Sequence, residues 1–216
     1  METHDKPPSQ RTAGTAVGST DYDKWYRKSW ADHRRWGDVW FTNVWGASHR
    51  DLAYINEPFN DAVTQSTWED RGFQNQRFTG DLYDMRSPEP AWMAHFRHWL
   101  PMRHFSWSIY RMTPGTVLPE HSDTYQRFRE IYDVTPGAVI RRYVIFLEDW
   151  QSGHYCEIDD APVVNWIQGK GVFWNGDTPH IAANIGRSDR YTLQITGVID
   201  GTMPPWRWQH ANPSFF

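Results

Sequence analysis

Cysteine is the residue that this chain most nearly lacks, because Cys156 is the only one among 216 residues. A single thiol forms no disulfide within the chain and cannot supply the several cysteines of a structural zinc site. The chain also contains no run of about 18 apolar residues, so we expect no transmembrane helix and no membrane partner. The composition therefore excludes a disulfide scaffold and a cysteine-rich metal site.

A basic stripe is missing as well. The 22 Lys and Arg residues are scattered along the chain, and the formal net charge is -4. Because binding to nucleic-acid phosphates needs clustered cations, we expect no nucleic-acid partner.

The first twenty residues are polar and rich in Gly, Thr and Ser, without the apolar segment of a secretory signal. We therefore expect residues 1–20 to form a disordered tail and the protein to be cytoplasmic. Residues 21–216 are enough to bury one sizeable core and too few to presume two, so we expect a single domain.

Aromatic residues, by contrast, are abundant: they make up 16% of the chain and include 14 Trp. Large rings add buried area to a core, and they also line pockets for small ligands. Four tryptophans of the first half could wall a pocket or pack around the core. We favour packing for Trp36, Trp40, Trp45 and Trp68.

The region 21–104 has an irregular, Trp-dense pattern, in which we expect helices outside the core. Residues 21–36 follow a loose amphipathic pattern. Residues 90–100 form a clearer helix, opened by Pro90 and closed before Pro101. Its apolar side chains recur at helical spacing and are predicted to cover a sheet: Trp92, Met93, Phe96, Trp99 and Leu100.

From residue 105 onward, short strands separated by Gly, Pro and Asp turns replace this pattern. Strands at such spacing are typical of a β-sandwich or jelly roll, so the predicted fold class is mainly β. We expect strands at 105–112, 141–147, 154–158, 162–167, 172–175, 181–185 and 190–199.

Two potential metal ligands stand at positions i and i+2 in His121-Ser122-Asp123. In extended backbone their side chains share one face, while Ser122 and the preceding Glu120 point away from it. His180 is the natural third ligand, because it follows a Gly-Asp-Thr-Pro turn and opens another predicted strand. Two imidazoles and one carboxylate leave three coordination positions open, which suits non-haem Fe(II) with a co-substrate and O₂.

Other histidines compete with this set, since a single His is more often a surface or hydrogen-bonded core residue than a ligand. His95 and His98, with His104 nearby, lie on or close to a predicted helix whose Trp and Met neighbours favour a core-covering role. His154 begins a predicted strand and could reach the interior, but it has no fixed partner.

Arg190 and Thr192 form a second constellation on one face of the last predicted strand. A guanidinium fork beside a hydroxyl suits a buried carboxylate. The alternative is an arginine at a strand end in solvent. The position of Arg190 after His180, across one hairpin, favours the binding role.

These residues belong to segments that occur in the order seen in Fe(II)/2-oxoglutarate-dependent oxygenases. Within that superfamily the chain resembles most the aspartyl/asparaginyl β-hydroxylase-like group, which has a Pro-Gly-Thr before the first ligand and a Trp…Gly-Lys-Gly run before the second histidine. The resemblance covers residues 105–200. The segments are 110–123 (YRMTPGTVLPEHSD), 142–147, 166–180 (WIQGKGVFWNGDTPH) and 190–192.

This resemblance implies a double-stranded β-helix, or jelly-roll, core with N-terminal helices packed outside it. It also implies that three residues bind the catalytic iron. The predicted ligands are His121, Asp123 and His180.

The resemblance further implies how 2-oxoglutarate is held. Arg190, with Thr192 beside it, would bind the distal carboxylate. Tyr110 would contact the same carboxylate, and Arg142 would reach the carboxylate nearer the iron.

The function that follows is a dioxygenase that hydroxylates a small polar metabolite, such as an amino acid or a peptide-like compound, and releases succinate and CO₂. A small molecule is therefore the expected partner. Three alternatives stay open: hydroxylation of a peptidyl or protein side chain, a cupin-type metalloenzyme that does not use 2-oxoglutarate, and a β-sandwich binding module.

Two features depart from the hydroxylase group. The vertebrate-type enzymes lack the carboxylate ligand, whereas Asp123 is present here. The spacing from His121 to Arg142 is also longer than expected, so residues 125–137 are predicted to form an extra loop or lid over the site.

Overall fold

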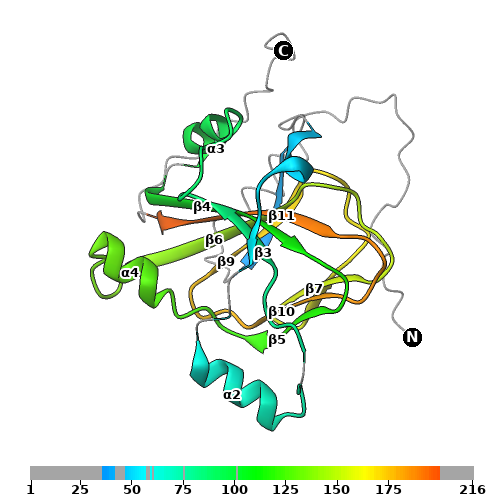
Figure 1. The fold of residues 1–216 in the computed structure, drawn as a ribbon. Coiled ribbons are helices and arrows are strands. Elements are labelled where there is room, and N and C mark those ends of the chain that lie inside the picture. Colours follow the sequence, from blue (N-terminus) through cyan, green and yellow to red (C-terminus); the bar gives the residue numbers. More distant parts are fainter. Residues whose placement is uncertain are drawn as a thin grey trace, which may run out of the picture. The chain divides into compact units, whose positions relative to one another are not determined.

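Strands β4 to β11 form the core of the protein (Figure 1). In this computed structural model they follow one another along the second half of the chain, interrupted by one short helix. Their bounds are β4 (Arg103–Met112), β5 (Thr116–His121), β6 (Val139–Phe146), β7 (His154–Ile158), β8 (Ala161–Val163), β9 (Lys170–Asn175), β10 (His180–Asn184) and β11 (Arg190–Ile199).

The structure describes residues 36–41, 47–56, 59, 61–74, 76–100 and 102–199. The chain divides into two units, Met1–Arg34 and Arg35–Phe216, and the described residues belong to the second. The expected tail 1–20, and all of the expected helix 21–36 except Trp36, lie outside the described residues. The prediction of a single domain from residue 21 onward therefore stays a prediction.

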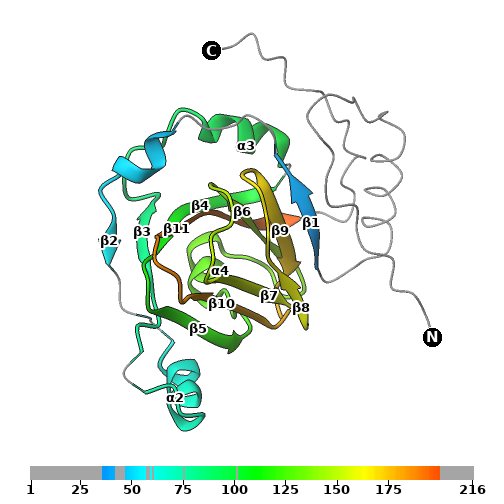
Figure 2. The ribbon, with the colours of Figure 1, turned by 90° about the vertical axis from the view of Figure 1, so that its right-hand side faces the viewer.

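The core strands pair into two antiparallel sheets. The larger sheet has the order β1-β9-β6-β11-β4-β3-β2, and the smaller one has the order β5-β10-β7-β8. When the eight core strands β4 to β11 are numbered one to eight, the larger sheet contains strands one, eight, three and six side by side in that order. The smaller sheet contains strands two, seven, four and five in that order. This order is that of a double-stranded β-helix, so the predicted jelly roll is confirmed. Figure 2 shows the two sheets facing each other around the interior.

The flanking region adds strands to the larger sheet that the irregular sequence pattern did not predict. They pair with strands far along the chain, β1 with β9 and β3 with β4, so local periodicity does not reveal them. A side chain at Gly37 would meet the Phe173 ring at 2.8 Å, so β1 approaches β9 closely only because this residue is glycine. These strands are β1 (Trp36–Trp40), β2 (Ile55–Asn56) and β3 (Asp81–Asp84).

The helices are short and lie outside the two sheets. The helix expected at 90–100 begins only at Met93, whose N–H donates to the carbonyl of Pro90 at 2.9 Å and closes a turn before it. As predicted, Met93, Phe96 and Leu100 pack against the sheet, while the side chain of Trp99 lies outside the description. The helices are η1 (Ala47–Asp51), α2 (Ala62–Asp70), α3 (Met93–Trp99) and α4 (Gln126–Tyr132).

Most predicted strands occur within one or two residues of their expected bounds, and 154–158 and 190–199 match them. The strand expected at 162–167 is shorter, because β8 ends at Val163 and Asn165 adopts a left-handed φ of 54°. The sequence pattern did not predict β5, the strand that ends on His121. Among the described residues, no helix is long and apolar enough to cross a membrane.

Alternation along β11 separates the outer face of the larger sheet from the interior. Tyr191, Leu193 and Ile195 belong to the outer core cluster that α3 covers. The residues between them, among them Thr192 and Gln194, therefore face the interior.

The interior itself has an apolar side and a polar side. An inner apolar cluster, made by β6, β7, β8 and β9, fills one side. On the other side, β4 and β11 place Ser108 opposite Gln194 and Tyr110 opposite Thr192. The inner apolar cluster consists of Val144, Phe146, Cys156, Ile158, Val163, Trp166, Val172 and Trp174.

Candidate metal centre

The three predicted metal ligands come together at one end of the interior. His121 ends β5 and His180 begins β10, and the two residues are paired partners in the antiparallel register. Their ring centroids are 4.3 Å apart. One ligand atom each from His121, Asp123 and His180 lies within 4.8 Å of the other two. The structure thus groups residues that the sequence separates by more than fifty positions.

Asp123 reaches this cluster from just beyond the end of β5. The strand ends at His121, and Ser122 and Asp123 follow it. Ser122 is exposed, as expected from the i, i+2 spacing of the two ligands, and its Oγ donates to the carbonyl of Asp177 at 3.1 Å. This bond ties the end of β5 to the turn that leads into His180.

Backbone carbonyls determine which imidazole nitrogen faces the cluster. His121 Nδ1 lies 2.8 Å from the carbonyl of Pro119, and His180 Nδ1 lies 3.0 Å from that of Thr178. A carbonyl oxygen only accepts, so Nδ1 carries a proton in each ring, and Nε2 is the nitrogen left to bind a metal. Metal-ligating histidines are commonly held in this orientation by a hydrogen bond from the ring nitrogen that does not bind the metal.

Charge around Asp123 also suits a cation. Its Oδ2 lies 3.7 Å from His180 Nε2 and 3.4 Å from Arg142 Nη1, and it is buried without a hydrogen bond from any described residue. Burial by itself would raise the pKa of Asp123, but Arg142 and the two histidines lower it to about 2. Burial lowers the pKa of His180 to about 4. At neutral pH the cluster therefore presents the anionic carboxylate and neutral imidazole that a divalent metal requires, and these residues fit such an ion.

Arg190 and Thr192 form a second polar group deeper in the interior. Arg190 is 5% exposed, and its Nη1 donates to the carbonyls of Tyr155 at 2.5 Å and Ala183 at 3.4 Å. Its Nε and the Thr192 hydroxyl have no partner among the described residues, and no carboxylate of those residues pairs with the guanidinium. Burial lowers the pKa of Arg190, because a buried cation without a counter-ion is unfavourable.

Tyr110 lies beside this pair, directly opposite Thr192 across the β4–β11 ladder. Its buried hydroxyl accepts a hydrogen bond from the N–H of Gly80 and also forms a side-chain hydrogen bond with Thr79. A side chain at Gly80 would come within 2.3 Å of the Arg111 carbonyl, so glycine is required for this approach. Arg190 and Thr192 therefore offer donors to one buried anion, with Tyr110 beside them.

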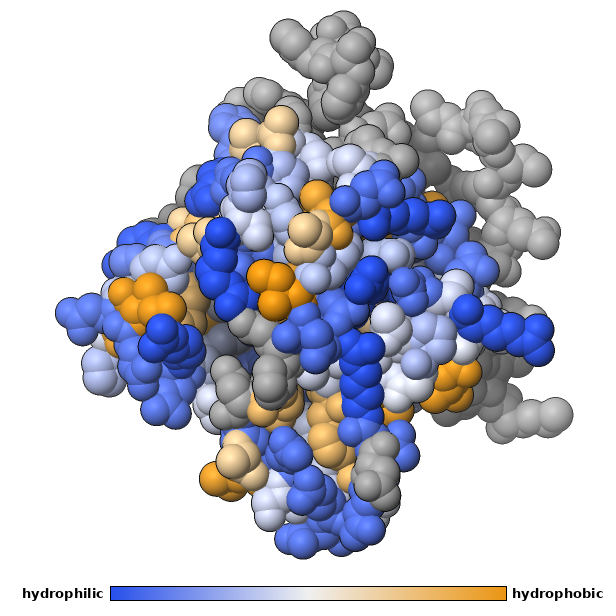
Figure 3. Space-filling view, in the orientation of Figure 1, coloured by the Kyte–Doolittle hydropathy of each residue, from blue (hydrophilic) through white to orange (hydrophobic). Residues whose placement is uncertain are grey.

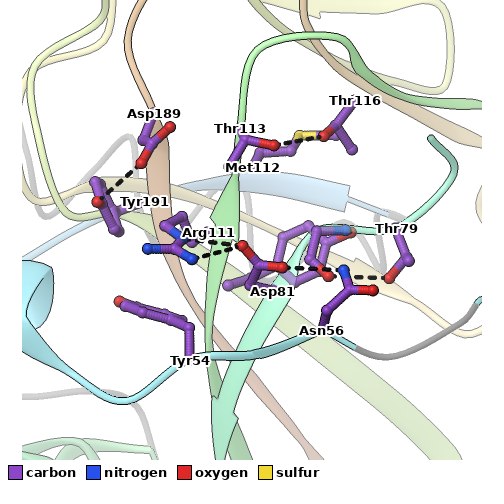
Figure 4. Close-up of polar contacts among 12 residues, drawn as sticks. Tyr54, Asn56, Thr79, Asp81, Arg111, Met112, Thr113, Thr116, Asp189 and Tyr191 are labelled. Atoms are coloured by element: carbon purple, nitrogen blue, oxygen red, sulfur yellow. Dashed lines mark hydrogen bonds and ion pairs between the residues drawn. The ribbon is translucent and has the colours of Figure 1, made fainter.

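A hydrogen-bond network around Asp81 lies next to Gly80 in the chain (Figure 4). The buried carboxylate of Asp81 accepts hydrogen bonds from Asn56 at 3.0 Å, Arg77 at 2.5 Å and Arg111 at 2.7 Å. These bonds join β2 and β3 to β4. Tyr110 is thus positioned by residues of the flanking region as well as by its own strand.

Arg142 lies at the metal end of the interior rather than beside Arg190. It pairs with Thr196 across β6 and β11, and its Nη1 donates to Gln194 at 3.3 Å. The same nitrogen faces Asp123. Its predicted contact with 2-oxoglutarate stays a prediction.

The competing histidines do not join the cluster in the described residues. His154 is buried, but its Nε2 lies 3.1 Å from the carbonyl of Ser188 and its ring stacks on Trp166. His98 and His104 are exposed, and the side chain of His95 lies outside the description. His154 is therefore a hydrogen-bonded core residue.

The tryptophans that are described pack around the core. Trp36 is partly buried against the inner apolar cluster, whereas Trp45 and the side chain of Trp40 lie outside the description. Trp68 is fully buried, its ring lies 5.2 Å from that of His121, and its Nε1 donates to the carbonyl of Glu120 at 3.1 Å. Trp68 thus supports a predicted metal ligand.

Sequence reasoning missed several residues that face the centre. Gln194 and Ser108 could have been found by extending the alternation of Arg190 and Thr192 one step along the strand and across to its partner. Tyr125 begins the segment that was predicted as an extra loop or lid, but nothing in the sequence singled out its side chain. Trp174 carried no comparable signal, because only the pairing of distant strands brings its ring to 4.5 Å from that of His180.

Comparisons with known proteins give similar folds without an assignment. No protein-family model and no curated protein matches the chain. A prolyl-4-hydroxylase of Pseudomonas putida is 15% identical, with a TM-score of 0.49, and the match covers 79% of this chain and 95% of that one. A viral collagen prolyl hydroxylase from Paramecium bursaria Chlorella virus 1, solved as a 2-oxoglutarate complex, is 10% identical, with a TM-score of 0.47 and coverage of 78% and 98%.

Other matches include the non-haem α-ketoglutarate-dependent carbocyclase SnoK from nogalamycin biosynthesis, at 14% identity and a TM-score of 0.45, with 83% of each chain covered. A cupin protein from Bacteroides fragilis is also 14% identical, with a TM-score of 0.35 and coverage of 61% and 91%. Likenesses this distant identify neither a family nor a reaction, and the jelly roll is established by the strand order itself.

Proposed function

We propose that this protein is a non-haem Fe(II)/2-oxoglutarate-dependent dioxygenase, related to the aspartyl/asparaginyl β-hydroxylase-like group through its motifs. The observation that carries this proposal is a set of metal ligands and an unpaired guanidinium in one interior. One ligand atom each from Asp123 and the two histidines lies within 4.8 Å of the others, and Arg142 Nη1 lies 3.4 Å from Asp123 Oδ2. The Arg190 guanidinium is buried without an anion from any described residue. A metal chelated by a dicarboxylate would engage both groups.

Each residue has a role in this proposal. The iron would be held by His121, Asp123 and His180. Iron and 2-oxoglutarate, when bound, would supply the activation of O₂ that is coupled to decarboxylation to succinate and CO₂. The chain's own contribution is to present two Nε2 atoms in fixed orientation and to keep one side of the interior dry with the inner apolar cluster.

The co-substrate would lie on the polar side of the interior. Arg190 and Thr192 would bind its distal carboxylate, and Tyr110 would contact the same group. Arg142, at the metal end, would reach the carboxylate nearer the iron.

A small polar metabolite is the substrate that this interior suits best. Ser108 and Gln194 are half-buried on the inner face between the two charged groups. Arg142 donates to the side-chain carbonyl oxygen of Gln194, so the N–H groups of the same side-chain amide stay available as donors. Hydroxyl and amide donors favour an amino acid or a peptide-like compound. A peptidyl or protein side chain is the second substrate class.

One observation favours a different activity, that of a cupin-type metalloenzyme without 2-oxoglutarate. Arg190 Nη1 is held by two backbone carbonyls, as a purely structural arginine would be. The two activities make opposite predictions for Arg190, because only the oxygenase needs it to bind a co-substrate.

The deciding experiment is an anaerobic titration of the Fe(II)-loaded protein with 2-oxoglutarate, followed through the visible charge-transfer absorption. We expect the wild type to show a band and Asp123→Ala to show none. In Arg190→Lys, which keeps the charge but loses the fork of donors, we expect the affinity for 2-oxoglutarate to fall at least about tenfold. Arg187→Ala is the matched control, since Arg187 is exposed in the turn before β11. A folded, iron-loaded wild type without a band would contradict the proposal and favour the cupin activity.

A further inference from the structure

Tyr125 has a backbone conformation that a bulky side chain rarely adopts. Its φ is 53° and its ψ is 24°, in the left-handed region, immediately before helix α4. Non-glycine residues keep such a conformation only where the surrounding structure holds them there. The conformation therefore points to a constraint on where this side chain lies.

Packing holds the Tyr125 ring on several sides. The residue is 7% exposed, and its ring belongs to a small cluster with Phe128, Ile140 and Val198. The guanidinium carbon of Arg142 lies 5.1 Å from the ring centroid. Helix α4, strand β6 and strand β11 thus all contribute to the position of one phenol.

The phenol hydroxyl faces the metal centre. Neither the Tyr125 hydroxyl nor Asp123 Oδ2 has a hydrogen-bond partner among the described residues, although both atoms are buried. A phenol hydroxyl can donate its proton to a carboxylate oxygen. Buried polar groups are normally hydrogen-bonded, so a small movement of either side chain would let this donor and this acceptor pair with each other.

We propose that Tyr125 is a positioning residue for the metal centre: its phenol donates to the Asp123 carboxylate and, with Arg142, holds that carboxylate to one-oxygen ligation. This inference rests on the proposed metal site. A carboxylate can bind a metal through one oxygen or two. If Asp123 used both, it would occupy one of the positions that a two-histidine, one-carboxylate centre leaves open for co-substrate and O₂.

Helix α4 carries Tyr125 to this position. Figure 1 places α4 at one end of the core, and in Figure 2 it is seen through the ring formed by the two sheets. At the other end of the helix, the Tyr132 ring lies 5.2 Å from that of His104, and its hydroxyl donates to the sulfur of Met85 at 3.8 Å. The segment predicted as an extra loop or lid thus supplies a group to the metal centre.

Tyr125→Phe tests the proposal, because it keeps the ring packing and removes only the hydroxyl. Tyr132→Phe is the matched control, since it removes a phenol hydroxyl from the same helix away from the ligands. The probe is Co(II), titrated into the metal-free protein, with its affinity and its visible d–d absorption as readouts. We expect Tyr125→Phe to weaken Co(II) binding about tenfold or more and to change the absorption envelope, while Tyr132→Phe matches the wild type.

Two outcomes would overturn the proposal. If Tyr125→Phe has the wild-type Co(II) affinity and spectrum, the phenol does not position Asp123, and this holds even if the metal-free variant melts at a lower temperature. If the wild type itself binds no Co(II), the metal centre fails and the inference with it. The first outcome leaves the proposed function intact, so the two failures are distinguishable.

Discussion

At the candidate metal centre, neighbouring groups fix the orientation of the ligand side chains in the metal-free protein. The carbonyls of Pro119 and Thr178 fix the proton on Nδ1 of the two histidines, and burial keeps His180 neutral. Because His180 is already neutral and Asp123 already anionic, these two ligands release few protons when a metal binds at neutral pH. In the metal-free protein, Arg142 is the described cation that offsets the charge of the Asp123 carboxylate.

Trp68 illustrates how a residue without any donor atom for the metal can still control it. We expect Trp68→Phe to lower the free energy of unfolding by about 1–3 kcal/mol, because it leaves a cavity and an unpaired carbonyl at Glu120. Metal affinity should fall as well, since the Trp68 ring supports His121. Urea unfolding and Co(II) titration measure the two effects. Val63→Ala, on the exposed face of the same helix, is the control, and equal unfolding midpoints for both variants would contradict the expectation.

At the scale of strands, alternation assigns two tasks to β11 at once. One face contributes Leu193 and Ile195 to the outer core, and the other carries Arg190, Thr192 and Gln194 into the interior. A one-residue slip in register would exchange the two sets. The same apolar packing that stabilises the larger sheet therefore positions Arg190 and Thr192.

The network around Asp81 joins the flanking strands to β4, and it predicts a pH dependence of stability. Burial raises the pKa of Asp81. The hydrogen bonds from Asn56 and Arg111 and the charges of Arg77 and Arg111 together lower it by more, so the net pKa is below the ordinary value. Its stabilising contribution is therefore complete above the unfolded pKa of about 4 and is lost as the pH falls through the lower folded pKa.

Asp81→Asn tests this element. At pH 7 we expect a loss of about 1–3 kcal/mol in the free energy of unfolding, at the modest end for an ion network because both arginines are partly exposed. Urea unfolding at several pH values should show the gap between wild type and variant closing below about pH 4. A gap that stays constant across this range would show that the carboxylate charge does not stabilise the fold.

For the molecule as a whole, the jelly roll brings together segments that lie far apart in the sequence. The candidate metal ligands come from the end of β5, the start of β10 and the loop before α4, while Tyr110, Arg190 and Thr192 come from β4 and β11. Ligands that bridge these elements should stabilise the folded state as a unit.

Ligand-linked stability provides a prediction at this scale. With Mn(II) and 2-oxoglutarate both at about 100 times their dissociation constants, each would add about 2.7 kcal/mol, which corresponds to a rise of roughly 5–10 °C in Tm per ligand. Anaerobic thermal melts with each ligand alone and with both would measure this, and EDTA should reverse it. We expect 2-oxoglutarate to give a larger shift with Mn(II) present than without it. An additive or absent 2-oxoglutarate shift would mean that the two ligands do not meet in the interior.

The sequence by itself determined the parts of this protein that local periodicity encodes. Turn residues between short alternating segments predicted the core strands, and the alternation of Arg190 with Thr192 predicted a shared inward face. The ligand types and their order along the chain predicted the residues that would gather around a metal. Each of these features depends on neighbouring residues, and strand geometry converts such spacing directly into a shared face.

Only the tertiary structure decided the features that depend on distant partners. Strands β1 and β3 exist because β9 and β4 offer free edges, and Trp68 lies beneath His121 because α2 packs against the end of β5. The bond from Ser122 ties the end of β5 to the turn before His180, and a left-handed backbone turns Tyr125 toward Asp123. Spacing along a chain carries no information about which remote segment will pack beside it, because long-range contacts form only when the whole core closes.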